Sequence, residues 1–185
     1  MNPDNPNQYR DGDTWRTLET RIDEIVVKGM GTVEHVTRMA HGRPIVDHLV
    51  PEAAMPAALR GTTGHALSLA WTGFQPSDEI KAALDLNRAT SIEEARAAYK
   101  PWKTPTWNIM LADREGHIGY QTIGAIPLRA RPKLGFRDAN NADDRWQGAI
   151  PFDGMPAMRD PERGWIASAN NQTAPDDFLY PSPAL

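Results

Sequence analysis

The sequence contains no cysteine among its 185 residues, which excludes disulfide bonds and thiolate chemistry. It also lacks an excess of positive charge, because 20 Lys and Arg residues are outnumbered by 24 Asp and Glu residues, for a net charge of −4. The basic residues are scattered along the chain rather than clustered. Nothing in this charge pattern indicates a nucleic-acid partner.

Long apolar segments are absent as well. No run approaches the roughly 20 apolar residues that a membrane-spanning helix needs, so no membrane partner is expected. The N-terminus, Met1 to Pro6, lacks the basic and apolar run of a signal peptide. The compartment stays unknown, because a cysteine-free protein is compatible with reducing and oxidising surroundings alike.

The remaining composition is that of a globular protein, with 40% hydrophobic and 24% charged residues. A chain of 185 residues is long enough for one domain with a hydrophobic core. Sixteen prolines and fourteen glycines indicate many loops and turns. No internal repeat divides the sequence, and we expect residues 1–185 to form a single domain.

The first part of the chain is dominated by strand patterns. Residues 1–14 are polar and are expected to be an irregular lead-in. Residues 15–39 alternate around a glycine turn and predict an antiparallel hairpin, which a short strand at residues 44–46 follows. The short apolar run at residues 66–71 predicts a buried strand.

Two short helices are predicted next. Ser77 is expected to cap the first helix, and Ser91 with Glu94 predicts a capping box at the start of the second. Pro101 should end the second helix. The side chains expected to face inward are Ile80, Ala83 and Leu84 of the first helix and Ile92, Ala95 and Tyr99 of the second.

The last part of the sequence predicts a second hairpin. Residues 107–112 form its first strand, and alternation from Ile118 to Thr122 forms the second. A long loop over residues 124–149 and a final strand over residues 164–169 should follow. Strands and helices do not alternate as in βαβ units, so the pattern predicts an α+β fold with mainly antiparallel strands and two short helices.

Few residues suggest catalysis by this chain alone. No serine lies in a Gly-x-Ser-x-Gly or Ser-x-x-Lys motif. The histidines at positions 35, 41 and 48 lack the spacing of a zinc-binding helix, and no complete calcium loop is present, so no metal site is predicted. A hydrolase with its own internal nucleophile, such as a threonine exposed by self-cleavage after glycine, stays an alternative.

Asn170 is the sharpest catalytic candidate, because a carboxamide at a strand end can donate hydrogen bonds to the oxyanion that forms during amide hydrolysis. The ordinary interpretation of the pair Asn170-Asn171 is a turn. Trp71 and Trp107 are candidates for an aromatic wall around an apolar acyl group, although tryptophans more often belong to the core.

Three phrases carry a family resemblance. Residues 108–120 (NIMLADREGHIGY), 146–153 (WQGAIPFD) and 164–171 (GWIASANN) occur in an order and at a spacing that resemble the β-chain of the penicillin acylase, or penicillin amidase, family of N-terminal-nucleophile hydrolases. Shorter similarities begin at Asn5, so the resemblance covers most of the chain.

The resemblance implies a part of a four-layer αββα sandwich and an enzyme that cleaves linear amide bonds. Its substrates would be small-molecule N-acylated amines, such as β-lactams or acyl homoserine lactones. The family's nucleophile is a serine that autoproteolysis exposes at the start of the β-chain. Asn170 matches the family's oxyanion-hole asparagine, and Trp71 and Trp107 match substrate-binding positions.

The resemblance also implies missing parts. The nucleophile serine should precede residue 1, an ordering arginine should follow residue 185, and the family's separate α-chain is absent. We therefore expect residues 1–185 to be a single incomplete domain, an internal part of a β-chain, and to be inactive alone. Its partners would be the α-chain and the remainder of the β-chain.

Calcium is possible in the complete parent, and no cofactor is expected for catalysis. The resemblance also implies that the parent is periplasmic or secreted. The alternative is a non-catalytic binding or interaction module that uses a tryptophan-rich surface.

Overall fold

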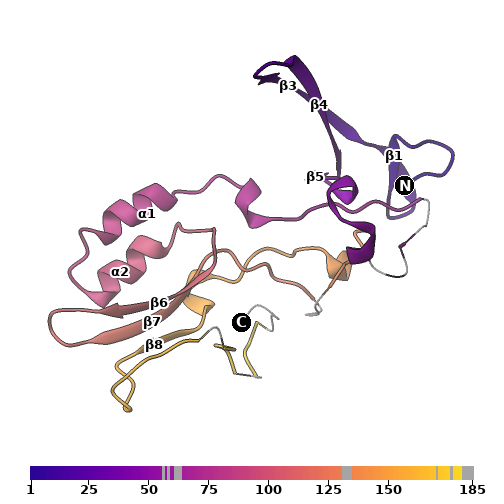
Figure 1. Cartoon of the computed structure of the whole chain (residues 1–185). Helices are drawn as coiled ribbons and strands as arrows, with labels where there is room; N and C mark the ends of the chain where they lie inside the picture. Colours follow the sequence, from indigo (N-terminus) through magenta and orange to yellow (C-terminus); the bar gives the residue numbers. More distant parts are fainter. Residues whose placement is uncertain are drawn as a thin grey trace. The chain divides into compact units, whose positions relative to one another are not determined.

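The computed structural model of the chain describes residues 1–55, 57, 59–60, 64–130, 135–169, 171–175 and 177–180 (Figure 1). The chain divides into two compact units, one built from residues 1–70 and 136–145 and the other from residues 71–135 and 146–185. The single incomplete domain expected from the sequence stays a prediction. No helix in the described ranges has the length and hydrophobicity to cross a membrane.

In the described residues all strand pairing is antiparallel and two α-helices accompany the sheets, which confirms the predicted α+β class. The strands are β1 (Gln8–Asp11), β2 (Thr14–Thr17), β3 (Glu19–Val27), β4 (Gly31–Ala40), β5 (Arg43–Pro44), β6 (Trp107–Ala112), β7 (Ile118–Ile123) and β8 (Ala157–Arg159). The α-helices are α1 (Glu79–Leu86) and α2 (Ile92–Tyr99).

The first unit holds two separate sheets, β1–β2 and β3–β4–β5. The predicted hairpin is confirmed, since β3 pairs with β4 and Ile22 lies opposite Val36. The expectation of an irregular lead-in over residues 1–14 is wrong, because β1 and β2 form a hairpin there. Gly12 turns this hairpin with a φ of 60°, a backbone conformation that glycine adopts without strain.

A carboxylate ties the N-terminal hairpin to a segment far along the chain. Arg145 donates a 2.8 Å hydrogen bond to Asp11, and the Nε of Arg16 lies 2.8 Å from the same carboxylate. The bond from Arg145 is the main cause that lowers the pKa of Asp11. His41 lies 3.6 Å away and packs edge-on against the ring of Tyr9. This cluster connects Arg145, the last residue of the segment 136–145, to the N-terminal hairpin of the first unit.

The strand predicted at residues 66–71 is wrong. Only Ser68 forms a bridge, with Ile45, and the side chain of Leu69 is exposed. The segment cannot form a ladder because its neighbour β5 is only two residues long. One of these residues is Pro44, which has no backbone N–H to donate. The main chain is held instead by single bonds such as Leu69 N to Pro44 O, at 2.9 Å.

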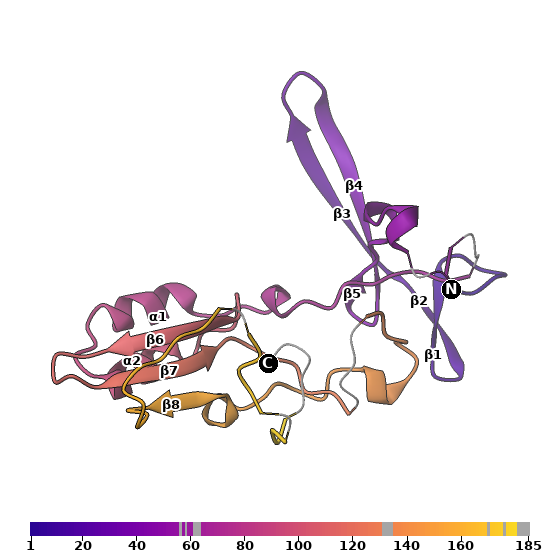
Figure 2. The same ribbon diagram turned by 60° about the horizontal axis from the view of Figure 1, so that its bottom comes forward.

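In the second unit, α1 and α2 lie on one face of the sheet β6–β7–β8 (Figures 1 and 2). Arg96 of α2 donates a 2.8 Å bond to Gln121 of β7, and a Cβ at Gly119 would come within 2.9 Å of Ile92. Gly119 and Gln121 therefore face the helices. Since strand side chains alternate, Tyr120 and its neighbours at i±2 lie on the opposite face.

Helix α2 forms as the sequence predicts. The Ser91 hydroxyl accepts a 3.2 Å bond from the Glu94 N–H, and the Glu94 carboxylate reaches back to the N–H of Thr90 at 2.7 Å. The first bond satisfies an N–H group of the first turn, and the second fixes the residue that precedes the N-cap. The residues predicted to face inward, Ile92, Ala95 and Tyr99, are buried.

Helix α1 differs from its prediction in cap and orientation. Its N-cap is Asp78 rather than Ser77, and Ile80 is 81% exposed, whereas Ala82 is fully buried. The cause is the carboxylate of Glu79, which is anchored in the protein and lies on the same helical face as Ala82, three residues later. The anchored face turns inward, so the predicted apolar stripe turns outward.

The Glu79 anchor joins α1 to the segment between α2 and β6. Its Oε1 accepts bonds from the Ser77 hydroxyl at 2.6 Å and from the backbone N–H groups of Lys103 at 3.0 Å and Thr104 at 3.1 Å. These donors, with Ser77 the largest contributor, lower the pKa of Glu79 to about 2. The ionised carboxylate thus fixes where the chain enters β6.

Glu79→Gln should lower the free energy of unfolding by about 1–3 kcal/mol, because the amide binds the three donors less strongly than the carboxylate does. The pKa of Glu79 is lowered on folding, so its contribution is present above the ordinary value of 4.5 and is lost as pH falls towards about 2. Urea unfolding between pH 3 and pH 7 measures both effects. Glu115→Gln, in an exposed turn, is the control, and equal losses for both variants would contradict the anchor.

Candidate functional site

The face of the sheet opposite the helices is the candidate site. The register pairs Asn108 with Thr122, Met110 with Tyr120, and Ala112 with Ile118. These six residues share one face because directly paired side chains point the same way and because alternate residues of a strand do so too. Polar side chains therefore gather at one end of this face and apolar ones at the other.

The polar end is a hydrogen-bonded group of three side chains. The Tyr120 hydroxyl donates a 2.6 Å bond to Oδ1 of Asn108 and lies 2.8 Å from the Thr122 hydroxyl, which is itself 3.3 Å from the same Oδ1. Tyr120 and Thr122 are buried. Since both hydroxyls converge on the amide oxygen, the Nδ2 group of Asn108 points away from them as a fixed donor.

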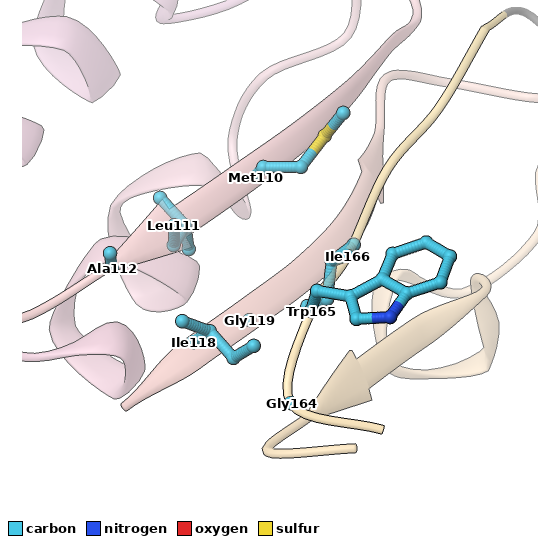
Figure 3. Close-up of a pocket in the computed structure, with 8 residues that line it drawn as sticks. All are labelled: Met110, Leu111, Ala112, Ile118, Gly119, Gly164, Trp165 and Ile166. Atoms are coloured by element: carbon cyan, nitrogen blue, oxygen red, sulfur yellow. The ribbon is translucent and has the colours of Figure 1, made fainter. Parts of the chain in front are cut away.

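The apolar end is a pocket, shown in Figure 3. The extended segment Gly164–Ile166 passes in front of β7 and places the indole of Trp165 beside the sheet. The side chain of Trp165 is more than half exposed. The residues that line this pocket are Met110, Leu111, Ala112, Ile118, Gly119, Gly164, Trp165 and Ile166.

The strand predicted at residues 164–169 is wrong, because this segment has no strand partner within the described residues. Its contacts are local, with Arg163 Nε donating to Trp165 O at 2.9 Å and Ala169 N donating to Asn171 Oδ1 at 3.1 Å. The third strand of this sheet is β8, which sequence reasoning missed. Asn170 lies outside the described residues, so its predicted role stays a prediction.

Trp107 lies on the face that the helices cover, since it pairs with the buried Ile123, two residues after Gln121. Its ring packs against Trp102 with centroids 5.1 Å apart, and Trp102 in turn contacts Tyr99 edge-on at 6.0 Å. Trp107 is nevertheless 48% exposed. Alternation therefore separates Trp107 from its sequence neighbour Asn108, which lies on the opposite face.

Trp71 lies in a short turn before α1. Its ring contacts Phe74 edge-on at 5.3 Å and covers Gly73, where a Cβ would come within 2.4 Å of the indole. The ring is 51% exposed. Among the described residues no ring contact joins Trp71 to Trp107, so the aromatic wall predicted from these two residues stays a prediction.

His117 and Asp160 form an electrostatic pair that the sequence did not indicate, where β7 begins and β8 ends. Asp160 accepts a 2.9 Å bond from the backbone N–H of Ile118, and its other oxygen lies 2.8 Å from Nδ1 of His117. The hydrogen bond raises the pKa of His117, whereas the N–H of Ile118 is the first cause that lowers the pKa of Asp160. The pair links the start of β7 to the end of β8.

No metal centre is evident in the part of the chain that the structure describes. There, no three or more His, Asp or Glu side chains come together to hold an ion. The calcium that the resemblance suggests for a complete parent stays a prediction.

Comparison with known proteins decides the family. The sequence profile of penicillin amidase matches residues 1–184. The chain belongs to the penicillin amidase family. It is similar to the acyl-homoserine lactone acylase QuiP of Pseudomonas fluorescens strain Pf0-1, with 28% identity over 92% of this chain, and to the penicillin G acylase of Escherichia coli, with 27% identity over 100% of it.

The fold comparison agrees with this assignment. The thermostable penicillin G acylase of Alcaligenes faecalis superposes with a TM-score of 0.70 and 25% identity, over 96% of this chain and 30% of that one. The penicillin amidase match thereby supports the α+β fold as well as the family. The chain spans about a fifth of the length of the curated relatives it matches.

Tyr120→Phe should release the Asn108 carboxamide in this penicillin amidase segment, because it removes the donor of the shorter bond to Oδ1. We expect faster hydrogen exchange of the Asn108 side-chain amide and a loss of about 1 kcal/mol in unfolding free energy. NMR of the side-chain amides and urea unfolding measure these changes. Tyr99→Phe is the control, since Tyr99 is also buried and no bond to its hydroxyl is seen among the described residues. An unchanged resonance and exchange rate of the Asn108 side-chain amide would show that the Tyr120 hydroxyl does not hold this carboxamide.

Proposed function

We propose that this chain is an internal segment of the β-chain of an amide hydrolase that removes the acyl group from small-molecule N-acylated amines. The observation that carries the proposal is the penicillin amidase match across residues 1–184. The fold similarity to a penicillin G acylase agrees with it. The attacking serine is proposed to lie in polypeptide outside these 185 residues, because the resemblance implies a serine at the start of the family's β-chain and the chain spans about a fifth of its curated relatives.

The proposed substrate class follows from the relatives' names. One group acts on acyl-homoserine lactones and the other on penicillin G. These molecules differ in the ring that carries the amine, but in both an acyl group is joined to nitrogen by a linear amide bond. The shared reaction is attack on that amide carbonyl and release of the amine.

Asn170 is proposed to stabilise the oxyanion of this reaction. Attack on the amide carbonyl places negative charge on its oxygen, and a fixed carboxamide N–H donor favours that charged state more than it favours the neutral substrate. Trp71 and Trp107 are proposed to contact the acyl group. Each ring is about half exposed, so each keeps an aromatic surface that a substrate or another part of the enzyme can cover.

Asn170→Ala in the complete enzyme should lower kcat by roughly 10²–10³ and change KM much less, because the donor acts mainly on the transition state. Steady-state hydrolysis of a chromogenic phenylacetyl amide measures both constants. Asn171→Ala is the matched control, since the Asn171 carboxamide is engaged with Ala169 N and Gln172 O in a local turn. Equal effects of the two variants would remove Asn170 from the site.

The 185-residue chain alone should not hydrolyse the same amide, because the proposed nucleophile lies outside it. Turnover measured against a buffer blank tests this, and turnover by the purified chain would show that it contains its own nucleophile. The half-exposed tryptophans favour one alternative, a non-catalytic binding module. That alternative requires a complete protein that binds N-acyl amines without turning them over.

A further inference from the structure

The β3–β4 hairpin exposes apolar side chains on both of its faces. Figure 2 shows its two strands running together well beyond β5, the short strand that pairs at its base. Val26 is 82% exposed, and a two-stranded hairpin whose faces are bare is marginally stable in water. The exposed large hydrophobic residues of the hairpin are Ile22, Ile25, Val26, Met30, Val33 and Val36.

The two faces differ in their charge balance. On one face, Asp23 lies opposite His35 and is bound by Arg21 Nε at 2.8 Å. On the other face, Glu24 lies directly opposite Glu34. Both carboxylates are exposed, and neither has a cationic partner in the described part of the chain. Like charges directly opposite each other destabilise a strand pair.

We call the second surface the acidic face. It consists of Ile22, Glu24, Val26, Thr32, Glu34 and Val36, and the pair Thr20 and Arg38 follows on the same face towards the base of the hairpin. Its pattern is a pair of carboxylates bordered by Ile22 and Val36 on one side and by Val26 on the other. A surface of this kind is complementary to an apolar patch that carries an arginine or lysine, because a buried cation would remove the repulsion and the apolar border would exclude water.

We infer that the acidic face is a docking surface for the remainder of the same polypeptide, which meets it with a basic side chain set among apolar residues. This inference rests on the proposed function only in taking the chain as a segment of a longer enzyme. The solved relative supports this occupant, since 70% of its chain lies outside the part that matches these residues. A second copy of the chain is the occupant that the test must exclude.

Glu24→Lys distinguishes a docked face from a free one by the sign of its effect. On a free hairpin, the introduced lysine would sit opposite Glu34, and the repulsive pair would become an attractive one. On a docked face, the new cation would meet the partner's cation. Hydrogen exchange of the peptide covering residues 19–40, measured by mass spectrometry in the complete polypeptide, reports the difference.

We expect Glu24→Lys to speed exchange of residues 19–40 by about tenfold or more, since like-charge contact at an interface is costly. Glu19→Lys is the matched control, because it makes the same charge change on the same strand but on the other face, opposite Met39. It should alter exchange little. Unchanged or slower exchange in Glu24→Lys would overturn the inference.

Glu24→Gln gives the same test if the lysine variant does not fold. It should speed exchange on a docked face, which loses an ion pair, and slow it on a free face, which loses a repulsion. Exchange of the unmodified protein that slows as its concentration rises would identify a second copy as the occupant and overturn the inference. None of these measurements uses a substrate. If the complete protein were inactive but residues 19–40 were protected from exchange, the proposed function would be refuted and the docking surface would stand.

Discussion

The alternation of side chains along β6 and β7 is the constraint on which the candidate site depends. One face of this hairpin is fastened to α2 through Arg96 and Gln121, and the other face carries the hydrogen-bonded Asn108 group and the pocket beside Trp165. Residues adjacent in sequence are thereby given different surroundings, with Trp107 beside Trp102 on the helical side and Asn108 beside the Tyr120 hydroxyl on the opposite side. A single step of register would exchange these two environments.

Elements with strong local signals were predictable from the sequence. Helix α2 and the β6–β7 hairpin follow from a capping serine, a turn and a period of two, all of which operate within a few residues. The outward rotation of α1 was not predictable, because it depends on bonds from Glu79 to backbone groups of Lys103 and Thr104. No periodicity within an eight-residue helix reports a partner 24 residues away.

The failures among the strands have a related cause. A strand needs a pairing partner as well as a suitable sequence. Residues 66–71 and 164–169 form no ladder in the described part of the chain, whereas β8 forms because it pairs with β7. Trp71 and Trp107 were named from their residue type and from the family resemblance. The structure adds that each is about half exposed and that Trp107 lies on the helical side of the sheet. The hydrogen bond from Tyr120 to Asn108 and the pair of His117 with Asp160 could not be predicted from the sequence, since each depends on cross-strand or loop contacts.

The contact between Gly119 and Ile92 sets the distance between the sheet and α2. A single added carbon at position 119 would enter the space that the isoleucine methyl group occupies, and Ile92 is itself almost fully buried. Ile92 can therefore approach the strand this closely only because residue 119 has no side chain. Residue 119 should accept no replacement by natural variation unless a smaller partner appears at residue 92, so the two positions are expected to change together or not at all.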